Sequence, residues 1–247
     1  MLKSLVRRLV APLSDNRAVS AIEFAIIAPI LVMLSLVGMD VGRYVYAAEQ
    51  ISRVANTVAQ IITSKSAVGP TGLITIDDAD LQSVHDSAQV VFPDILADSE
   101  RQGVIWDSLI AINIASISFT AGPGGCTTNC TTYTPLVRWT GVSNPRSCGA
   151  SFTPMVDSHS PDPALLPDDM YPPAGANGPN NRTGNIIVVD IAYTYRPVLT
   201  GSEWNTGFFS VPTITIQRSV YMSPRYTPTE IIYVPGGTPM QVATNCP

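Results

Sequence analysis

The chain has 247 residues, a formal net charge of −5 and a charged fraction of only 13%. It contains no basic stripe, and this acidic balance argues against a nucleic-acid partner. Its 21 prolines and 17 glycines are typical of an extracytoplasmic sheet domain with long loops, and they indicate nothing about catalysis.

The longest apolar stretch covers residues 18–39 and reads AVSAIEFAIIAPILVMLSLVGM, with Glu23 as its only ionisable residue. As a helix it would span roughly 33 Å, close to the hydrocarbon core of a bilayer. Backbone groups in lipid must bond within the segment, so we expect a transmembrane helix. Its membrane-spanning residues would include Ile26, Ile27, Pro29, Leu31 and Leu34. A buried core helix of a soluble domain is the alternative, but such a long apolar run is rare there.

Charge on the two sides of this stretch predicts its orientation. Residues 1–17 contain Lys3, Arg7, Arg8 and Arg17 against one acid, which favours a cytoplasmic N-terminus. A cleaved secretory signal is the competing interpretation. It fits less well, because the apolar core is long and no small-x-small site follows it.

Glu23 is the unusual residue of the stretch, because a carboxylate inside a membrane helix is costly and suggests a function. A basic leader, a small residue and then Glu23-Phe24 resemble the processing pattern of type IV pilins. Cleavage after Ala18 would make Val19 the first residue and Glu23 the fifth. The resemblance implies that Glu23 then faces the N-terminal amine of a neighbouring subunit during assembly. Such leaders usually have Gly where this chain has Ala18. The alternative for Glu23 is that it lies near the cytoplasmic interface and its side chain reaches out of the lipid at little cost.

Residues 15–29 read DNRAVSAIEFAIIAP. They resemble the opening of the TadE/TadG-like proteins of the tight-adherence (Flp) pilus, which have Arg-Gly-x-x-Ala-x-Glu-Phe-Ala and then a proline. Residues 42–46, GRYVY, resemble the Gly-Arg-aromatic segment of the same family. The resemblance implies a pilin-like α+β fold and a role in building that pilus.

Beyond Met39 the apolar residues become periodic, with steps of three and four. They are Val41, Tyr44, Val45, Ala48, Ile51, Ala55, Val58, Ile61 and Ile62. Arg43, Gln50 and Arg53 lie off this stripe. We therefore expect the helix to continue to about Ser64, with a bend at Pro29. The stripe would pack on the protein's own sheet, on other subunits, or on both.

Residues 67–76 are rich in Gly and Pro and predict a connector. Acids at 77–80, a periodic apolar pattern and Pro93 predict a short helix that ends near Phe92. We reject a calcium site at these acids, because EF-hand spacing is absent. His85 is expected to be exposed in mid-helix.

Alternating or β-rich runs predict an antiparallel sheet. They cover 104–119, with a break near Asp107-Ser108, then a shorter strand around 136–139 within 131–140, then 186–195, 213–222 and a short edge at 231–234. Residues 141–185 predict a long surface excursion. The order resembles the TadE-like periplasmic domain, with matching segments at 137–139, 188–197 and 223–225.

All four cysteines lie on the side that we place outside the cytoplasm, where an even number favours two disulfides. Cys126 and Cys130 flank a tight turn, so pairing them would staple a hairpin. Cys148 and Cys246 would then tie the excursion to the tail, although the other pairings stay open. A zinc site is a weak rival, because no second close Cys or His pair exists.

The sequence offers little for an enzyme. It has no nucleophile elbow, phosphate loop, dinucleotide fingerprint or His-Glu-x-x-His motif. The Asp-x-Ser-x-Ser metal motif of a von Willebrand-type domain is also absent. We expect no catalytic residue, metal or cofactor; an anchored hydrolase that uses His159 is a distant alternative.

These features predict an α+β, pilin-like protein in which a long N-terminal transmembrane helix continues into a small antiparallel sheet domain with long loops. Its parts would be a basic cytoplasmic arm (1–17), the helix (18–64) and a periplasmic domain (65–247). The resemblance implies a minor pilin, pseudopilin or assembly factor of the bacterial inner membrane, incorporated in the pilus or not. Its partners would be the membrane and other pilus components, not nucleic acid or a small-molecule substrate. The alternative is an uncleaved envelope binding protein that acts through its loops.

Overall fold

The computed structural model describes residues 16–65, 74–121, 133–142, 146, 148, 182–197, 213–224, 231–236 and 243–246. The chain divides into two compact units. The first is Met1–Tyr46 with Arg196–Pro212, and the second is Ala47–Tyr195 with Thr213–Pro247. The helix α2 (Asn16–Thr63) contributes residues to both units.

The second unit holds the other elements. Its helices are α3 (Asp78–Val91), α4 (Asp94–Gln102) and the 3₁₀ helix η2 (Trp106–Ser108). Its strands are β1 (Ile74–Ile76), β2 (Ile110–Ala121), β3 (Tyr133–Val142), β4 (Arg182–Tyr195), β5 (Ile214–Met222), β6 (Ile231–Tyr233) and β7 (Ala243–Asn245). A long apolar helix followed by an antiparallel sheet confirms the predicted α+β class.

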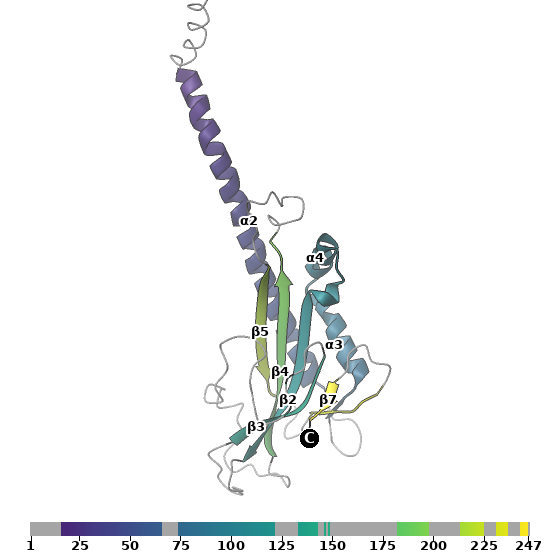
Figure 1. Cartoon of the computed structure of the whole chain (residues 1–247). Helices are drawn as coiled ribbons and strands as arrows, with labels where there is room; N and C mark the ends of the chain where they lie inside the picture. Colours follow the sequence, from purple (N-terminus) through teal and green to yellow (C-terminus); the bar gives the residue numbers. More distant parts are fainter. Residues whose placement is uncertain are drawn as a thin grey trace, which may run out of the picture. The chain divides into compact units, whose positions relative to one another are not determined.

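The main sheet has the strand order β5-β4-β2-β3-β7, and all its neighbouring strands are antiparallel (Figure 1). β2 and β4 lie at its centre, with Ile112 opposite Ile191 and Ala115 opposite Val188. The central place of β4 fits its sequence, since a strand buried on both faces needs an almost continuous apolar run. β1 and β6 form a separate parallel pair.

One face of the main sheet carries the larger core. Seven side chains of β2 and β4 on this face are at most 1% exposed: Ile110, Ile112, Ile114, Ile187, Val189, Ile191 and Tyr193. The hydroxyl of Thr63 in α2 donates to Sδ of Met222 in β5 at 3.2 Å. Phe92, next to α3, meets the Tyr193 ring edge-on, with 5.3 Å between the centroids. The second half of α2 and α3 therefore cover this face.

The second half of α2 shows the one-sided burial that its periodicity predicts. After Ala47, which is 4% exposed, its buried apolar side chains are at most 1% exposed, namely Ile51, Val54, Ala55, Val58, Ala59 and Ile62. Val41 and Val45 of the predicted stripe are 56% and 58% exposed and so do not pack on the protein's own sheet, and Gln50, which was predicted to lie off the stripe, is only 8% exposed. The reason is that burial begins at Ala47, where the helix joins the unit that contains the sheet.

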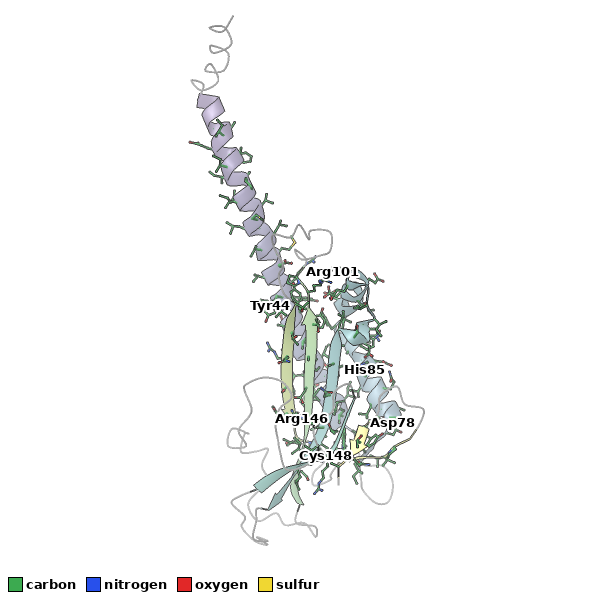
Figure 2. All side chains as sticks on the ribbon, viewed as in Figure 1. Tyr44, Asp78, His85, Arg101, Arg146 and Cys148 are labelled. Atoms are coloured by element: carbon green, nitrogen blue, oxygen red, sulfur yellow. A yellow bond between two sulfur atoms is a disulfide. The ribbon has the colours of Figure 1, made fainter. Side chains whose placement is uncertain are left out.

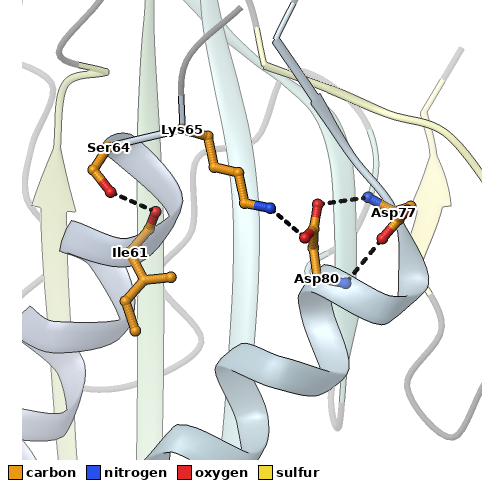
Figure 3. Close-up of polar contacts among 5 residues, drawn as sticks. All are labelled: Ile61, Ser64, Lys65, Asp77 and Asp80. Atoms are coloured by element: carbon orange, nitrogen blue, oxygen red, sulfur yellow. Dashed lines mark hydrogen bonds and ion pairs between the residues drawn. The ribbon is translucent and has the colours of Figure 1, made fainter. Parts of the chain in front are cut away.

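Helix α3 begins where its sequence predicts, at a reciprocal cap. The Asp80 N–H donates to Asp77 Oδ1 at 2.9 Å, and the Asp77 N–H donates to the Asp80 carboxylate at 3.4 Å. Lys65, which follows α2, also donates to Asp80 (Figure 3). Beside it, the Ser64 hydroxyl donates to the Ile61 carbonyl at 2.9 Å. These acids therefore cap α3 and link its start to the end of α2.

The prediction that His85 is exposed is wrong. Its side chain is 2% exposed, and its Nε2 lies 2.8 Å from Asp107 Oδ1. Its ring lies 4.8 Å from the Trp106 ring, between centroids. His85 shares the buried face of α3 with Leu81 and Ala88, because residues three and four apart lie on one side of a helix.

The predicted strands around 136–139 and at 186–195, 213–222 and 231–234 correspond to β3, β4, β5 and β6, within four residues at each end, and β3 is longer than predicted. The strand expected over 104–119 begins only at Ile110, because η2 occupies the place of the expected break.

Some short elements were not predicted. They are the nine-residue helix α4 and the three-residue strands β1 and β7, of which β1 lies inside the expected connector. A segment this short has no periodic signal, and its pairing with a distant strand defines it. Most of the 141–185 excursion lies outside the described residues.

Buried tyrosines are held by carboxylates in this unit. The Tyr193 hydroxyl donates to Asp98, which also accepts from Arg101 Nη2 at 2.9 Å. The Tyr233 hydroxyl donates to Asp78. Burial, together with these carboxylates, raises the pKa of Tyr193 and of Tyr233 above the usual range.

Stability should therefore fall at alkaline pH. The stabilisation from neutral Tyr193 is complete below about pH 10, where an unfolded tyrosine ionises, and it is lost as the pH rises further. Each such group lowers the free energy of unfolding by about 1.4 kcal/mol per pH unit above that point. Urea unfolding of the full chain in detergent should show a flatter alkaline decline for Tyr193→Phe. Parallel curves for this variant and the wild type would contradict the assignment.

Candidate membrane and assembly site

The first half of α2 is apolar on every side. Between Ser20 and Tyr46 no side chain is buried by the rest of the chain. Four of the predicted transmembrane side chains are more than half exposed, namely Leu34 (64%), Ile26 (62%), Leu31 (55%) and Ile27 (51%), and Phe24, predicted with Glu23 to act in assembly, is 70% exposed. Among the described residues, α2 is the helix that is long and apolar enough to cross a membrane. A helix that is apolar all round is suited to lipid rather than to water.

Glu23 interrupts this apolar surface and is exposed. It lies seven residues after the helix start at Asn16, which is about 10 Å along the axis. The next cation along the sequence is Arg43, about 30 Å away. A cation that neutralises Glu23 in lipid therefore has to come from the N-terminal arm or from another molecule.

The proposed processing residues lie at the start of α2. Ala18 and Val19 belong to its first turn, where the first four N–H groups have no partner within the helix. Pro29 lies inside α2 and has no N–H to donate to the carbonyl of Ala25. A cleavage site at this end would require only the first turn to unwind.

A buried ion pair within the second unit joins Arg146 to Asp190 of the central strand β4. Asp190 in β4 is 1% exposed, and Arg146 is 4% exposed (Figure 2). Arg146 donates from Nε and Nη2 to the two carboxylate oxygens, at 2.7 and 2.8 Å. The Ser219 hydroxyl also donates to this carboxylate, at 2.6 Å. The fork of the guanidinium satisfies both oxygens, as a buried carboxylate requires.

This ion pair lies on the sheet face opposite the helices, because Asp190 alternates with Val189 and Ile191. The same face carries a smaller apolar cluster: Ala115, Ile117, Val137, Ile186 and Val188, with Tyr221 and Cys246 packed against it. Burial raises the pKa of the Tyr221 hydroxyl.

Cys148 is bonded to Cys246, with their Cα atoms 5.3 Å apart (Figure 2). The Cys246 N–H donates to the Arg138 carbonyl at 2.7 Å, next to the pairing of β7 with β3. Residues 146 and 148 are thus fixed to the central strand and to the sheet edge. Cys126 and Cys130, the other expected pair, lie outside the described residues.

A metal site or a catalytic site would require suitable side chains to lie close together. Within the described ranges, no group of three or more His, Cys, Asp or Glu side chains is arranged to hold a metal ion. Asp78 accepts from Tyr233 and from the Gly236 N–H at 3.1 Å. His159 lies outside the described residues, and the absence of catalysis stays a prediction.

Comparison with known proteins gives a match for most of α2. Residues 18–60 match the family model described as TadE-like protein. This segment is TadE-like. The match covers about one-sixth of the chain and includes Ala18, Glu23, Phe24 and Pro29. It confirms the resemblance of the N-terminal segment, whereas the resemblance at 137–139, 188–197 and 223–225 lies outside it and stays a prediction. Comparisons with curated proteins and with solved structures gave no match.

Sequence reasoning found the TadE-like segment but missed Arg146 and Ser219 as partners of Asp190. The available signal was Asp190 itself, since one acid in the apolar run of a central strand requires a buried partner. With only 14 Lys and Arg in the chain, few cations could have provided it. Nothing in the sequence near Arg146 singles it out.

Removing Arg146 should destabilise the second unit strongly. Arg146→Ala leaves the Asp190 carboxylate buried without its cation, so the free energy of unfolding should fall by about 3–5 kcal/mol. Arg53→Ala is the matched control, because Arg53 and its partner Glu49 are 61% and 58% exposed, and it should cost less than about 1 kcal/mol. Urea unfolding measures both. Equal small losses would show that the ion pair does not hold the segment.

The disulfide should stabilise the folded unit only while it is oxidised. It closes a loop with a sequence separation of 98, so Cys246→Ser should lower the free energy of unfolding by about 2–5 kcal/mol. Reductant should lower the free energy of unfolding of the wild type by a similar amount. Any further loss that reductant causes in Cys246→Ser belongs to Cys126 and Cys130. A wild type that is insensitive to reductant would contradict the role of this bond.

Proposed function

We propose that the chain is a pseudopilin-like component of a Tad (Flp) pilus system, anchored in the bacterial inner membrane by α2. Its N-terminus lies in the cytoplasm and its second unit in the periplasm. The role is mechanical and interfacial, with no catalytic step, cofactor or small-molecule substrate. The observation that carries the proposal is the TadE-like match over a helix that is apolar on every side.

Charge and cysteine chemistry support this orientation. The basic residues Arg7, Arg8 and Arg17 precede the apolar segment, and such residues favour the cytoplasmic side. The bond between Cys148 and Cys246 lies in the part of the chain after the helix. Disulfides persist in the periplasm and are rare in the cytoplasm.

Glu23 supports a role in assembly beside other membrane helices. It is exposed, and residues 18–39 contain no cation. If the chain is cleaved after Ala18, the new amine at Val19 of a neighbouring subunit is a suitable cation. Attraction between the two charges is strong in surroundings of low dielectric constant and sets the register of neighbouring helices.

An uncleaved envelope binding protein is the second candidate. One observation favours it, namely Ala18 at the position where pilin-type leaders usually have Gly. Intact mass and N-terminal sequencing of protein extracted from membranes separate the two. A chain that begins at Val19 supports the pseudopilin proposal, and a chain that begins at Met1 supports the uncleaved binding protein.

Loss of the Glu23 charge should impair assembly without unfolding the protein. We expect Glu23→Gln and Glu23→Ala to lower the amount of surface pili by at least about tenfold, which corresponds to about 1.4 kcal/mol. The amount of protein in the membrane and its thermal unfolding should not change, because Glu23 contacts no folded core. Sheared pili and membrane fractions are measured by immunoblot.

Glu49→Gln is the matched control for this test. Glu49 lies on the same helix, and its exposed partner is Arg53 at 2.6 Å, so its loss should leave piliation unchanged. Normal piliation in both Glu23 variants would refute the assembly role of Glu23. Equal losses in the Glu49 control would point to a general defect of the helix.

A further inference from the structure

Exposed large apolar side chains gather at one end of the second unit. Among its described residues they are Val90 (82%), Ile105 (71%), Leu96 (42%), Val104 (42%) and Ile214 (38%), with Val234 (45%) elsewhere. Val90 ends α3, Leu96 lies in α4, and Val104 and Ile105 connect α4 to η2. Single exposed apolar residues are ordinary, but their concentration at one end requires an explanation.

The strand register identifies this end. Ile110 at the start of β2 lies opposite Tyr193, and Ile214 at the start of β5 lies opposite Tyr195 at the end of β4. Residues 104–109 lead directly into Ile110. Figure 1 shows α4 beside the end of the sheet where β4 finishes, and Figure 2 places Arg101 at that end and Asp78 at the other.

The same end receives the chain from α2. Ser52 accepts from Arg218 Nε at 3.1 Å, whereas Thr63 contacts Met222. Arg218 lies nearer than Met222 to Ile214, the start of β5. Moving back along α2 from Thr63 toward Ala47 therefore leads to the end that carries the apolar side chains.

Ile105 is held outward by local structure. Gly103 ends α4 in the left-handed conformation, with φ of 67°, which favours glycine. The Val104 N–H donates to the Ser99 carbonyl at 3.1 Å. The Ile105 carbonyl accepts from the N–H and the hydroxyl of Ser108, at 3.0 and 2.7 Å. Ile105 is therefore a fixed protrusion between two helices.

We propose that this apolar end contacts the surface of the lipid bilayer that α2 crosses. The proposal rests on the membrane anchoring in the proposed function. Ala47, the first residue of the unit, lies about 6 Å along the helix from Arg43, which is suited to the headgroup layer. Because α2 enters the unit at this end, the chain itself keeps the end close to the bilayer surface, where aliphatic side chains can enter the boundary between headgroups and acyl chains.

Charge indicates the kind of lipid. α4 carries Asp94, Asp98 and Glu100 against Arg101, and Asp98 already binds Arg101 and Tyr193. This acidic surround would be repelled by anionic headgroups. The contact is therefore apolar and is suited to a zwitterionic surface such as phosphatidylcholine.

Trp106 is the natural reporter, because it follows Ile105 directly. The full chain is reconstituted in phosphatidylcholine vesicles that contain lipid brominated near the top of the acyl chain, and bromine quenching of tryptophan fluorescence is measured. Trp106→Phe identifies the share of the signal that comes from Trp106. We expect Ile105→Glu to lower the quenching of Trp106 by at least about threefold, since it replaces an apolar anchor with a charge.

Val234→Glu is the matched control, because Val234 is 45% exposed and lies beyond β6, away from α4. It should leave the quenching of Trp106 unchanged. Thermal unfolding shows that the variants are folded. Should Ile105→Glu fail to fold, Ile105→Ser replaces it, with a smaller expected loss.

A failure of anchoring would look different from a failure of this contact. If α2 does not cross the membrane, the chain leaves the vesicles in an alkaline carbonate wash. If the chain resists the wash but bromine does not quench Trp106, the lipid contact is refuted. A third outcome is that bromine does not quench Trp106 but its emission shifts when the chain is diluted in lipid. That outcome would show that this end contacts a second copy of the chain, and it would also overturn the proposal.

Discussion

The structure depends on one helix, α2, whose first half is apolar on every side and whose second half packs on the sheet of the second unit. From Ser20 to Met39, α2 exposes apolar side chains in all directions, which water disfavours and lipid accepts. From Ala47 it buries one stripe against the sheet and leaves Glu49 and Arg53 exposed. In the proposed anchoring, the membrane surface lies within a few residues of Asp40 and Arg43, because a charge carried into lipid is costly.

The sheet of the second unit is completed by contacts that are distant in sequence. Its helix-covered face uses ordinary apolar packing, whereas the opposite face combines a small apolar cluster with the Arg146–Asp190 pair. The bond from Cys148 to Cys246 ties the same segment to the sheet edge. A face that relies on a disulfide and a buried ion pair is suited to an oxidising compartment, in agreement with the proposed orientation.

Long patterns in the sequence predicted long elements, and short elements escaped. The apolar run and the periodicity after it predicted α2, and the acids before Leu81 predicted the start of α3. β7 and α4 were missed because their stability comes from distant partners rather than from local sequence. The same reason explains His85, which its partners in η2 bury, and Arg146, which pairs with a strand 44 residues away. Of the candidate site, the apolar helix with its lone Glu23 could be predicted, since a motif and a composition define it.

The central claim is that α2 changes its surroundings from lipid to protein between Met39 and Ala47. A spin-label scan along residues 20–62 of the full chain in vesicles tests it, with accessibility to oxygen and to a water-soluble nickel complex as the readouts. We predict high oxygen accessibility on every side up to Met39, and then a helical period with protection at Ile51, Ala55 and Val58. A periodic pattern that extends back to Ser20, or high nickel accessibility there, would contradict the account.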